Sequence, residues 1–206
     1  MIPIFPLPNV VLFPNVFLPL HIFEPRYKEM VRDSLIGDRI IGMVLLREKQ
    51  DTDVDRSSSV YSIGCAGLIT HYEQLKAGRY NIVLRGLHKF RILHEDLSRT
   101  YRQAQIETVE ECHSAEELRE ARLRLDLSLE QRVPSNITSK LSSNMDDGDL
   151  INALSQYLEF EPIEKQALLE RNGIVERCRA LSDLLEIQSL TAVSYTHLTL
   201  PTSDLV

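Results

Sequence analysis

The apolar residues of this chain change their spacing near residue 112, and that change limits its fold more than any other feature. Up to about residue 111, short apolar runs are separated by Pro, Gly and polar clusters, which is typical of β-strands. From residue 114 to about residue 190, apolar residues recur every three or four positions, which is typical of amphipathic helices. The sequence therefore predicts an α+β protein, with a small barrel or sandwich at residues 1–112 and a helical bundle at residues 113–192.

The segment from Tyr80 to Ile92 gives the clearest strand signal. Its even-numbered positions are mainly apolar and its odd-numbered positions mainly polar, which predicts one buried and one exposed face. In this pattern His88 belongs to the buried face and Lys89 to the exposed face. Gly86, in the middle of the segment, predicts a bend or a bulge.

One helix is predicted within the strand-rich half. Pro25 suits the first position of a helix and Gly37 suits its end, so we expect a helix between them. The Glu24 side chain is expected to cap the free amides of the first turn and to interact favourably with the helix dipole. Arg26 is expected to pair with Glu24 or with a carbonyl at the domain junction.

Four helices are predicted in the second half. The one near residue 150 has a continuous apolar face at helical spacing, formed by Leu150, Ala153, Leu154, Tyr157 and Leu158. Tyr157 is therefore expected in the core. The stretch at residues 134–149 is rich in Ser, Asn and Asp and predicts a linker or a lid.

Charge is unevenly distributed along the chain. Residues 1–111 contain 14 Lys or Arg and 14 Asp or Glu, whereas residues 112–192 contain 9 and 15. This balance argues against nucleic acid as the main partner, because phosphate-binding surfaces carry an excess of Lys and Arg. A short basic strip, formed by Arg79, Arg85, Lys89 and Arg91, keeps RNA binding as an alternative.

No group of residues predicts an enzyme. The sequence has no Walker-type phosphate loop, no dinucleotide-binding glycine motif and no zinc-type spacing among its His and Cys residues. We therefore predict no catalytic residue, no cofactor and no metal. No apolar run approaches the ~20 residues needed to cross a bilayer, and the N-terminus has no signal-peptide pattern. These features predict a cytoplasmic protein that has no membrane partner.

Aromatic residues are dense in the first 27 positions, where they are Phe5, Phe13, Phe17, Phe23 and Tyr27. If such side chains are exposed in a groove, they can hold apolar segments of an unfolded chain; otherwise they belong to the core. The region around Tyr72 and Tyr80 offers a second, weaker surface. The candidate polypeptide-binding residues are Phe13, Phe17, Phe23, Tyr27, Tyr72 and Tyr80.

Residues 4–14 (IFPLPNVVLFP) and 18–27 (LPLHIFEPRY) resemble the start of the Lon N-terminal (substrate-binding) domain. Shorter matches follow in the same order, so that the resemblance spans about residues 2–190. It implies a PUA-like β pseudo-barrel with one inserted helix, followed by a helical bundle. It also implies a role in recognising unfolded or damaged polypeptide for an ATP-dependent protease.

The residues at 21–27 are more like those of stand-alone bacterial members of this family, which lack the ATPase and peptidase domains. We therefore expect a non-catalytic polypeptide-recognition module whose partner is unfolded polypeptide or another protein. A truncated N-terminal fragment of a Lon protease and a PUA-like RNA-binding protein are the alternatives. The oligomeric state is not predicted.

Residues 193–206 (VSYTHLTLPTSDLV) break the helical pattern and closely resemble a translated sequencing-adapter tail. We expect them to be non-native and base no functional argument on them.

Overall fold

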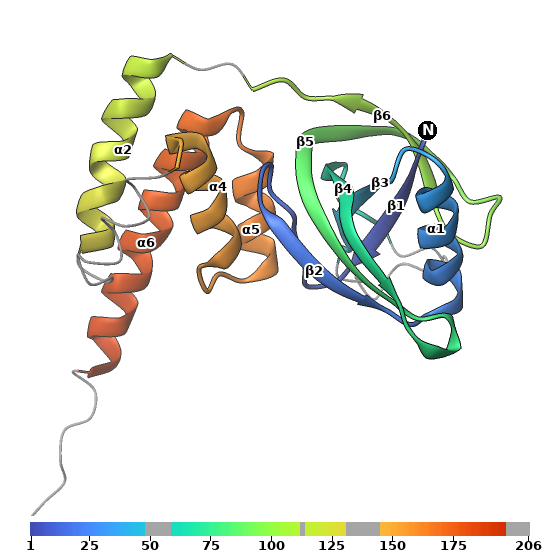
Figure 1. The fold of residues 1–206 in the computed structure, drawn as a ribbon. Coiled ribbons are helices and arrows are strands. Elements are labelled where there is room, and N and C mark those ends of the chain that lie inside the picture. The colour runs from blue at the N-terminus through green and yellow to red at the C-terminus, as the bar shows by residue number, and fades with distance from the viewer. Residues whose placement is uncertain (48–58, 112–113, 131–144, 197–206) are drawn as a thin grey trace, which may run out of the picture.

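The computed structural model describes residues 1–47, 59–111, 114–130 and 145–196, which form a β-barrel beside a group of helices (Figure 1). The strands are β1 (Ile2–Leu7), β2 (Phe17–Ile22), β3 (Ile40–Leu45), β4 (Ile63–Gln74), β5 (Tyr80–Asp96) and β6 (Gln103–Thr108). The helices are α1 (Pro25–Ile36), α2 (Ala115–Glu130), α4 (Asp147–Tyr157), α5 (Pro162–Glu170) and α6 (Ile174–Thr196). The predicted α+β class is confirmed, and so is the helix between Pro25 and Gly37.

The long strand β5 organises the barrel. Strand β4 pairs with β5 over residues 80–91 in antiparallel register. On the other edge of β5, β2 pairs with residues 80–85 and β6 pairs with residues 90–96. The parallel pair β1–β3 and the antiparallel pairs β3–β4 and β1–β6 complete the ring. The sheet therefore closes into the predicted pseudo-barrel.

A bulge in β5 reverses two predicted side-chain orientations. Gly67 pairs with Gly86 and Cys65 pairs with Lys89, so three steps along β5 match two steps along β4. The extra residue shifts the alternation of side chains beyond it. As a result His88 is exposed and Lys89 is buried, the reverse of what was predicted. The predicted irregularity at Gly86 is confirmed.

Helix α1 lies against the barrel beside β1 (Figure 1). It buries one apolar face, formed by Tyr27, Met30 and Val31, in a cluster with strand residues. Glu24 stands at the N-cap position, but its side chain makes no capping hydrogen bond. The carboxylate pairs with the Arg26 guanidinium at 2.9 Å, which confirms one of the two roles predicted for Arg26. The predicted capping role of Glu24 was therefore wrong.

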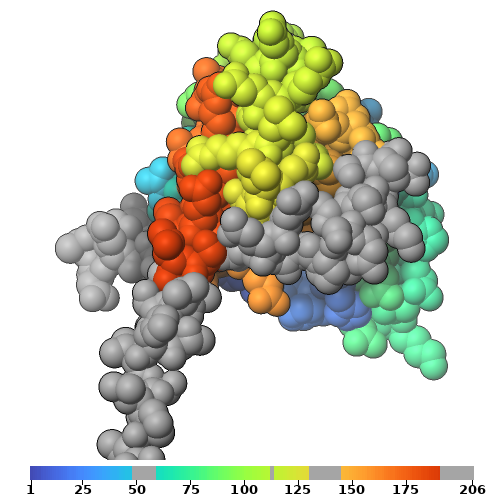
Figure 2. All heavy atoms as spheres, turned by 90° about the vertical axis from the view of Figure 1, so that its left-hand side faces the viewer, coloured from blue at the N-terminus to red at the C-terminus, as the bar shows by residue number. Residues whose placement is uncertain are grey.

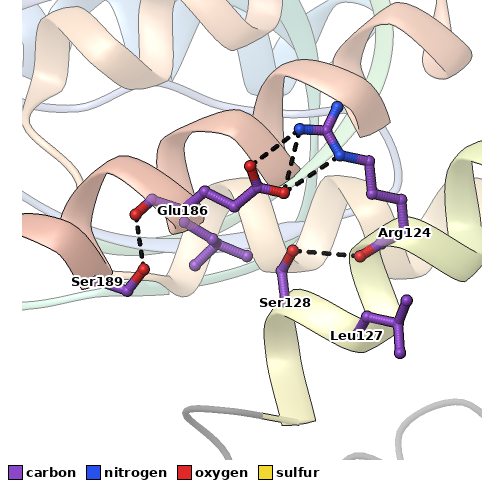
Figure 3. A pocket seen from close by; sticks show the side chains of 6 residues that line it. Arg124, Leu127, Ser128, Glu186 and Ser189 are labelled. Atoms are coloured by element: carbon purple, nitrogen blue, oxygen red, sulfur yellow. Dashed lines mark hydrogen bonds and ion pairs between the residues drawn. The ribbon is translucent and has the colours of Figure 1, made fainter.

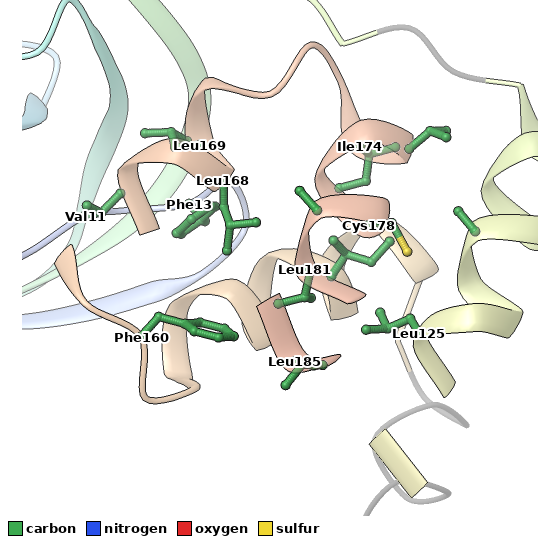
Figure 4. Close-up of a cluster of buried hydrophobic side chains, with 14 of the residues drawn as sticks. Val11, Phe13, Leu125, Phe160, Leu168, Leu169, Ile174, Cys178, Leu181 and Leu185 are labelled. Carbon is green, nitrogen blue, oxygen red and sulfur yellow. The ribbon is translucent and has the colours of Figure 1, made fainter. Parts of the chain in front are cut away.

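One hydrophobic cluster extends across both parts of the molecule (Figure 4). The barrel and the loop before β2 contribute Val11, Phe13, Val16, Leu45 and Ile63. The helices contribute residues that include Leu118, Ala121, Leu125 and Leu129 of α2 and Ile174, Cys178, Leu181 and Leu185 of α6. Burial of this shared apolar surface holds the barrel against the helices.

Helix α4 exposes a residue that the sequence pattern assigned to the core. Tyr157 is 65% exposed, whereas Asn152 and Gln156 are buried. Buried polar groups require hydrogen-bond partners, and both have one: Asn152 accepts from Arg177 at 2.7 Å, and Gln156 accepts from the backbone N–H of Phe13 at 3.2 Å. The predicted burial of Tyr157 was wrong, because these junction contacts fix the rotation of the helix.

Two predictions fall largely outside the described residues. The linker predicted at residues 134–149 is described only from residue 145, and α4 begins near its end at Asp147. The tail predicted from residue 193 is described only to Thr196, where α6 ends.

Candidate functional site

The six aromatic candidates divide into buried and exposed side chains. The buried ones are Phe13, Tyr27 and Tyr80. Phe13 packs in the cluster shared with the helices, and Tyr27 packs on Phe5 with ring centroids 4.3 Å apart. Burial also raises the pKa of the Tyr27 hydroxyl. The exposed ones are Phe17, Phe23 and Tyr72, at 50%, 62% and 46%. Burial in the core removes the first three residues from the candidate surface.

Phe17 and Phe23 belong to one row of exposed side chains along β2. Side chains alternate between the two faces of a strand, and the exposed positions of β2 are Phe17, Pro19 and His21. Phe23 follows the strand, and its ring stacks on that of His21 with centroids 6.2 Å apart and planes at 25°. We call the row of Phe17, Pro19, His21 and Phe23 the β2 face. It carries no charge while His21 is neutral, on a chain whose net charge is −7.

Helix α4 extends this surface onto the helical part. The Tyr157 hydroxyl donates a hydrogen bond of 2.9 Å to the backbone carbonyl of Phe17. A polar rim lies beside them: Arg85, opposite Phe17 in register, donates to Asn15 at 3.2 Å, and the Asn15 amide donates to Asp149 at 2.8 Å. Sequence reasoning missed Tyr157 as a surface residue, because its apolar spacing fits a core position equally well.

Two polar residues on adjacent strands hold the His21 ring. Its Nδ1 lies 2.8 Å from Oδ1 of Asn81, the residue directly opposite on β5. The Asn81 Nδ2 donates in turn to Oε2 of Glu73 on β4, at 3.1 Å. This hydrogen-bonded chain sets the orientation of the imidazole within the β2 face.

Tyr72 is exposed on the other face of the sheet. It pairs with Ile82, whose side chain is buried, whereas its neighbour Glu73 pairs with Asn81 and shares the face of His21. Directly opposed residues of antiparallel strands have their side chains on the same face. The structure therefore separates Tyr72 from the β2 face, and the six candidates do not form one surface.

A cleft of about 690 Å³ lies between the barrel and the helical part. Its lining includes His88, Lys89, Glu111, Asp149 and Asn152. The Lys89 ammonium lies 2.9 Å from the Glu111 carboxylate, and the buried Arg177 guanidinium pairs with the same carboxylate. Burial alone would raise the pKa of Glu111, but the charges and hydrogen bonds of Arg177 and Lys89 outweigh burial and lower it.

Both cations of this buried charge network also donate to backbone carbonyls. Lys89 donates to the backbone carbonyl of Arg171 at 2.6 Å, and Arg177 donates to that of Leu168 at 3.1 Å. Both carbonyls lie at the C-terminal end of α5, where the helix dipole favours cations. The network therefore explains how the two parts are joined. Burial of Lys89 also removes one of the four residues of the basic strip on which the RNA-binding alternative rested.

Helices α2 and α6 lie side by side on the face turned away from the barrel (Figure 2). A hollow of about 190 Å³ between them is lined by Arg124, Leu127, Ser128, Leu185, Glu186 and Ser189 (Figure 3). The Arg124 guanidinium lies 3.0 Å from Glu186 and 2.8 Å from Asp183. These side chains are about half exposed, so that the pairs resemble ordinary surface ion pairs.

Cys65 and Cys178 are buried free cysteines. Burial raises the pKa of Cys65 to about 12 and that of Cys178 to about 11, so neither is a nucleophile at neutral pH. Within the described ranges, no three His, Cys, Asp or Glu side chains are grouped so as to hold a metal ion. No helix in that part of the chain has both the length and the apolar character to cross a membrane.

Comparisons with curated proteins identify relatives of this chain. It is 26% identical over 193 residues to Lon protease 2 of Myxococcus xanthus, and 29% identical over 185 residues to the Lon protease of Flavobacterium johnsoniae. The alignments cover 90% and 85% of this chain, but only 23% and 22% of the relatives. The chain therefore spans about a quarter of the length of the curated relatives that it matches.

Two solved structures share the fold. The N-terminal domain of the Mycobacterium avium complex Lon protease matches with a TM-score of 0.68 at 16% identity, covering 90% of this chain and 97% of that domain. The Lon N-terminal domain protein from Xanthomonas campestris matches with a TM-score of 0.59 at 18% identity, covering 93% and 96%. A family model matches residues 1–186, and the chain therefore belongs to the family described as the ATP-dependent protease La (LON) substrate-binding domain.

Proposed function

We propose that this chain is a polypeptide-recognition module and that the β2 face binds apolar segments of unfolded protein. The family supplies the class of ligand, because the substrate of a protease is a polypeptide. The location of the binding surface is supported by one observation: the row of Phe17, Pro19, His21 and Phe23 is exposed and uncharged on an acidic chain. Delivery of the bound polypeptide to an ATP-dependent protease in the cytoplasm is the role that we propose for the module.

The chemistry of the β2 face suits an extended apolar segment. Alternate side chains of a strand are about 7 Å apart, so an extended ligand presents its own side chains at the same repeat. Full burial of a Phe side chain contributes about 1.5–3 kcal/mol. The polar rim of Arg85, Asn15 and Asp149 lies beside the apolar row. A rim of this kind excludes water from the apolar residues at the centre of a binding surface.

The test measures binding of fluorescently labelled, reduced and carboxymethylated lactalbumin by anisotropy, at low and at physiological salt. The double variant Phe17→Ala/Phe23→Ala should lose about tenfold or more in affinity, equivalent to about 1.4 kcal/mol. Tyr72→Ala is the matched control, because it removes an exposed aromatic ring from the other face of the sheet. Circular dichroism checks that each variant is folded.

Three outcomes would contradict the proposal in different ways. Equal affinity for the wild type and the double variant would rule out the β2 face as the location. No polypeptide binding by the wild type would contradict the function itself. A short RNA, measured in parallel, tests the alternative: salt-sensitive RNA binding without polypeptide binding would favour it.

A further inference from the structure

The protonation of His21 can be assigned from its hydrogen-bond partners. The Glu73 carboxylate only accepts, so the group of Asn81 that faces it must be the NH₂ group. The carbonyl oxygen of the Asn81 amide then faces His21, at 2.8 Å from Nδ1. Because this oxygen only accepts, Nδ1 carries the proton. In the neutral ring the other nitrogen, Nε2, is therefore a bare acceptor.

No other side chain of the β2 face carries a hydrogen-bond acceptor. Phe17, Pro19 and Phe23 bring only apolar surface to the β2 face, and His21 is exposed between them. An extended polypeptide laid along this row would place some of its backbone N–H groups against apolar rings. Removing an N–H group from water without a new partner opposes binding.

We propose that His21 Nε2 accepts a hydrogen bond from a backbone N–H of the bound segment and makes recognition sensitive to pH. This inference rests on the proposed function, since it names the polar contact of the same site. It assigns to the ligand an extended segment with a free N–H between two apolar contacts, one near Phe17 and one near Phe23. His21 is thus the residue that fixes the register of the ligand.

Protonation reverses this role. The imidazolium form of histidine has two donors and no acceptor. Two sets of charged groups lie near His21. Glu73 on β4 pairs with Asn81, and the ion pair of Glu24 and Arg26 follows β2 in the chain. Uncharged ligands should prefer the neutral ring, so that their affinity should fall in acid.

The first measurement needs no ligand. Long-range ¹H–¹⁵N spectra of protein labelled at histidine distinguish a protonated Nδ1 from a protonated Nε2 in each ring. We expect His21 above pH 7 to carry its proton on Nδ1. A ring protonated on Nε2 would overturn the inference whether or not polypeptide binds.

The second measurement titrates a short fluorescent peptide, in which Leu alternates with Ser, at about pH 7.5 and about pH 5.5. The wild type should bind more weakly at the lower pH, because the imidazolium has no acceptor. His21→Gln keeps an acceptor that does not titrate and should bind equally at both values, and His21→Leu should bind severalfold more weakly than His21→Gln. His88→Gln, which changes an exposed histidine elsewhere on β5, should behave as the wild type.

The outcomes separate the two proposals. Peptide binding that is independent of pH, or that falls equally in His21→Gln, would overturn the role of His21 and leave the β2 face as the binding site. Failure of the wild type to bind at either pH would count against the proposed function itself, while the tautomer spectra would still report on the acceptor.

Discussion

The hydroxyl of Tyr157 donates a 2.9 Å hydrogen bond to the backbone carbonyl of Phe17, joining the last residue of α4 to the first residue of β2. The contact spans 140 positions in the chain and joins an exposed tyrosine of the helices to the backbone of an exposed phenylalanine of the barrel. A ligand that lies along the β2 face would therefore meet both parts of the molecule.

Tyr157 can be tested by separating its hydroxyl from its ring. Tyr157→Phe removes the hydrogen bond and should lower the free energy of unfolding by about 0.5–1 kcal/mol, measured by urea denaturation. Polypeptide affinity should change little in this variant. Tyr157→Ala also removes the ring and should weaken polypeptide binding severalfold. An Ala variant that binds as well as the Phe variant would place Tyr157 outside the binding surface.

Glu111 should be the most sensitive charge at the junction. Glu111→Gln leaves the buried Lys89 and Arg177 without their counter-charge, and should lower the free energy of unfolding by about 3 kcal/mol at pH 7. Glu186→Gln, which changes an exposed ion pair, should have no measurable effect. Equal effects of the two changes would mean that the buried network does not stabilise the junction.

Acid should weaken the same network. Folding lowers the pKa of Glu111, so its carboxylate contributes stability that is fully present above about pH 4.3, the ordinary value for Glu. That contribution is lost as the pH falls through the lower pKa of the folded state. Urea denaturation at successive pH values should show a smaller acid loss for Glu111→Gln than for the wild type, and parallel curves would refute this assignment.

Gly86 should tolerate no side chain. A Cβ at this position would lie 2.0 Å from the carbonyl oxygen of Phe13, which is backbone and cannot rotate away. Gly86→Ala should therefore lower the free energy of unfolding by about 2 kcal/mol or more. Gly148→Ala in α4 meets no atom closer than 3.8 Å and should instead be neutral or stabilising. Thermal or urea denaturation of both variants makes the comparison.

The two buried thiols should resist alkylation in the folded protein. With pKa values of about 12 and 11, Cys65 and Cys178 are almost entirely protonated at pH 8. In a Cys112→Ser background, mass spectrometry after iodoacetamide treatment should find neither thiol modified until denaturant is added. Rapid modification of either one in native buffer would contradict its burial.

The sequence predicts elements better than it predicts faces. The bounds of α1 follow from Pro25 and Gly37, whose effects are local and therefore readable from sequence. The reversed exposure of His88 and Lys89 depends on a bulge, and the position of that bulge is set by pairing with β4. The period of two residues indicates a strand, but it does not show where the alternation slips.

The same limit applies to the candidate site. Aromatic density in the first 27 residues predicted Phe17 and Phe23 as surface candidates, and both side chains are exposed. It could not separate them from Phe13, because Phe13 is buried by helices that come more than 100 positions later in the chain. Tyr157 reaches the surface for a comparable reason: the rotation of α4 is set by polar contacts with residues outside the helix, Phe13 and Arg177.

The bulge between Gly86 and Lys89 divides β5 into two stretches with separate phases. The stretch before it supports β2, and the stretch after it begins with the lysine that enters the charge network of the junction. The side chains that support β2 can therefore change without turning Lys89 out of the joint between barrel and helices. Within a single strand, support for the proposed binding face is separated from the contact that joins the two parts.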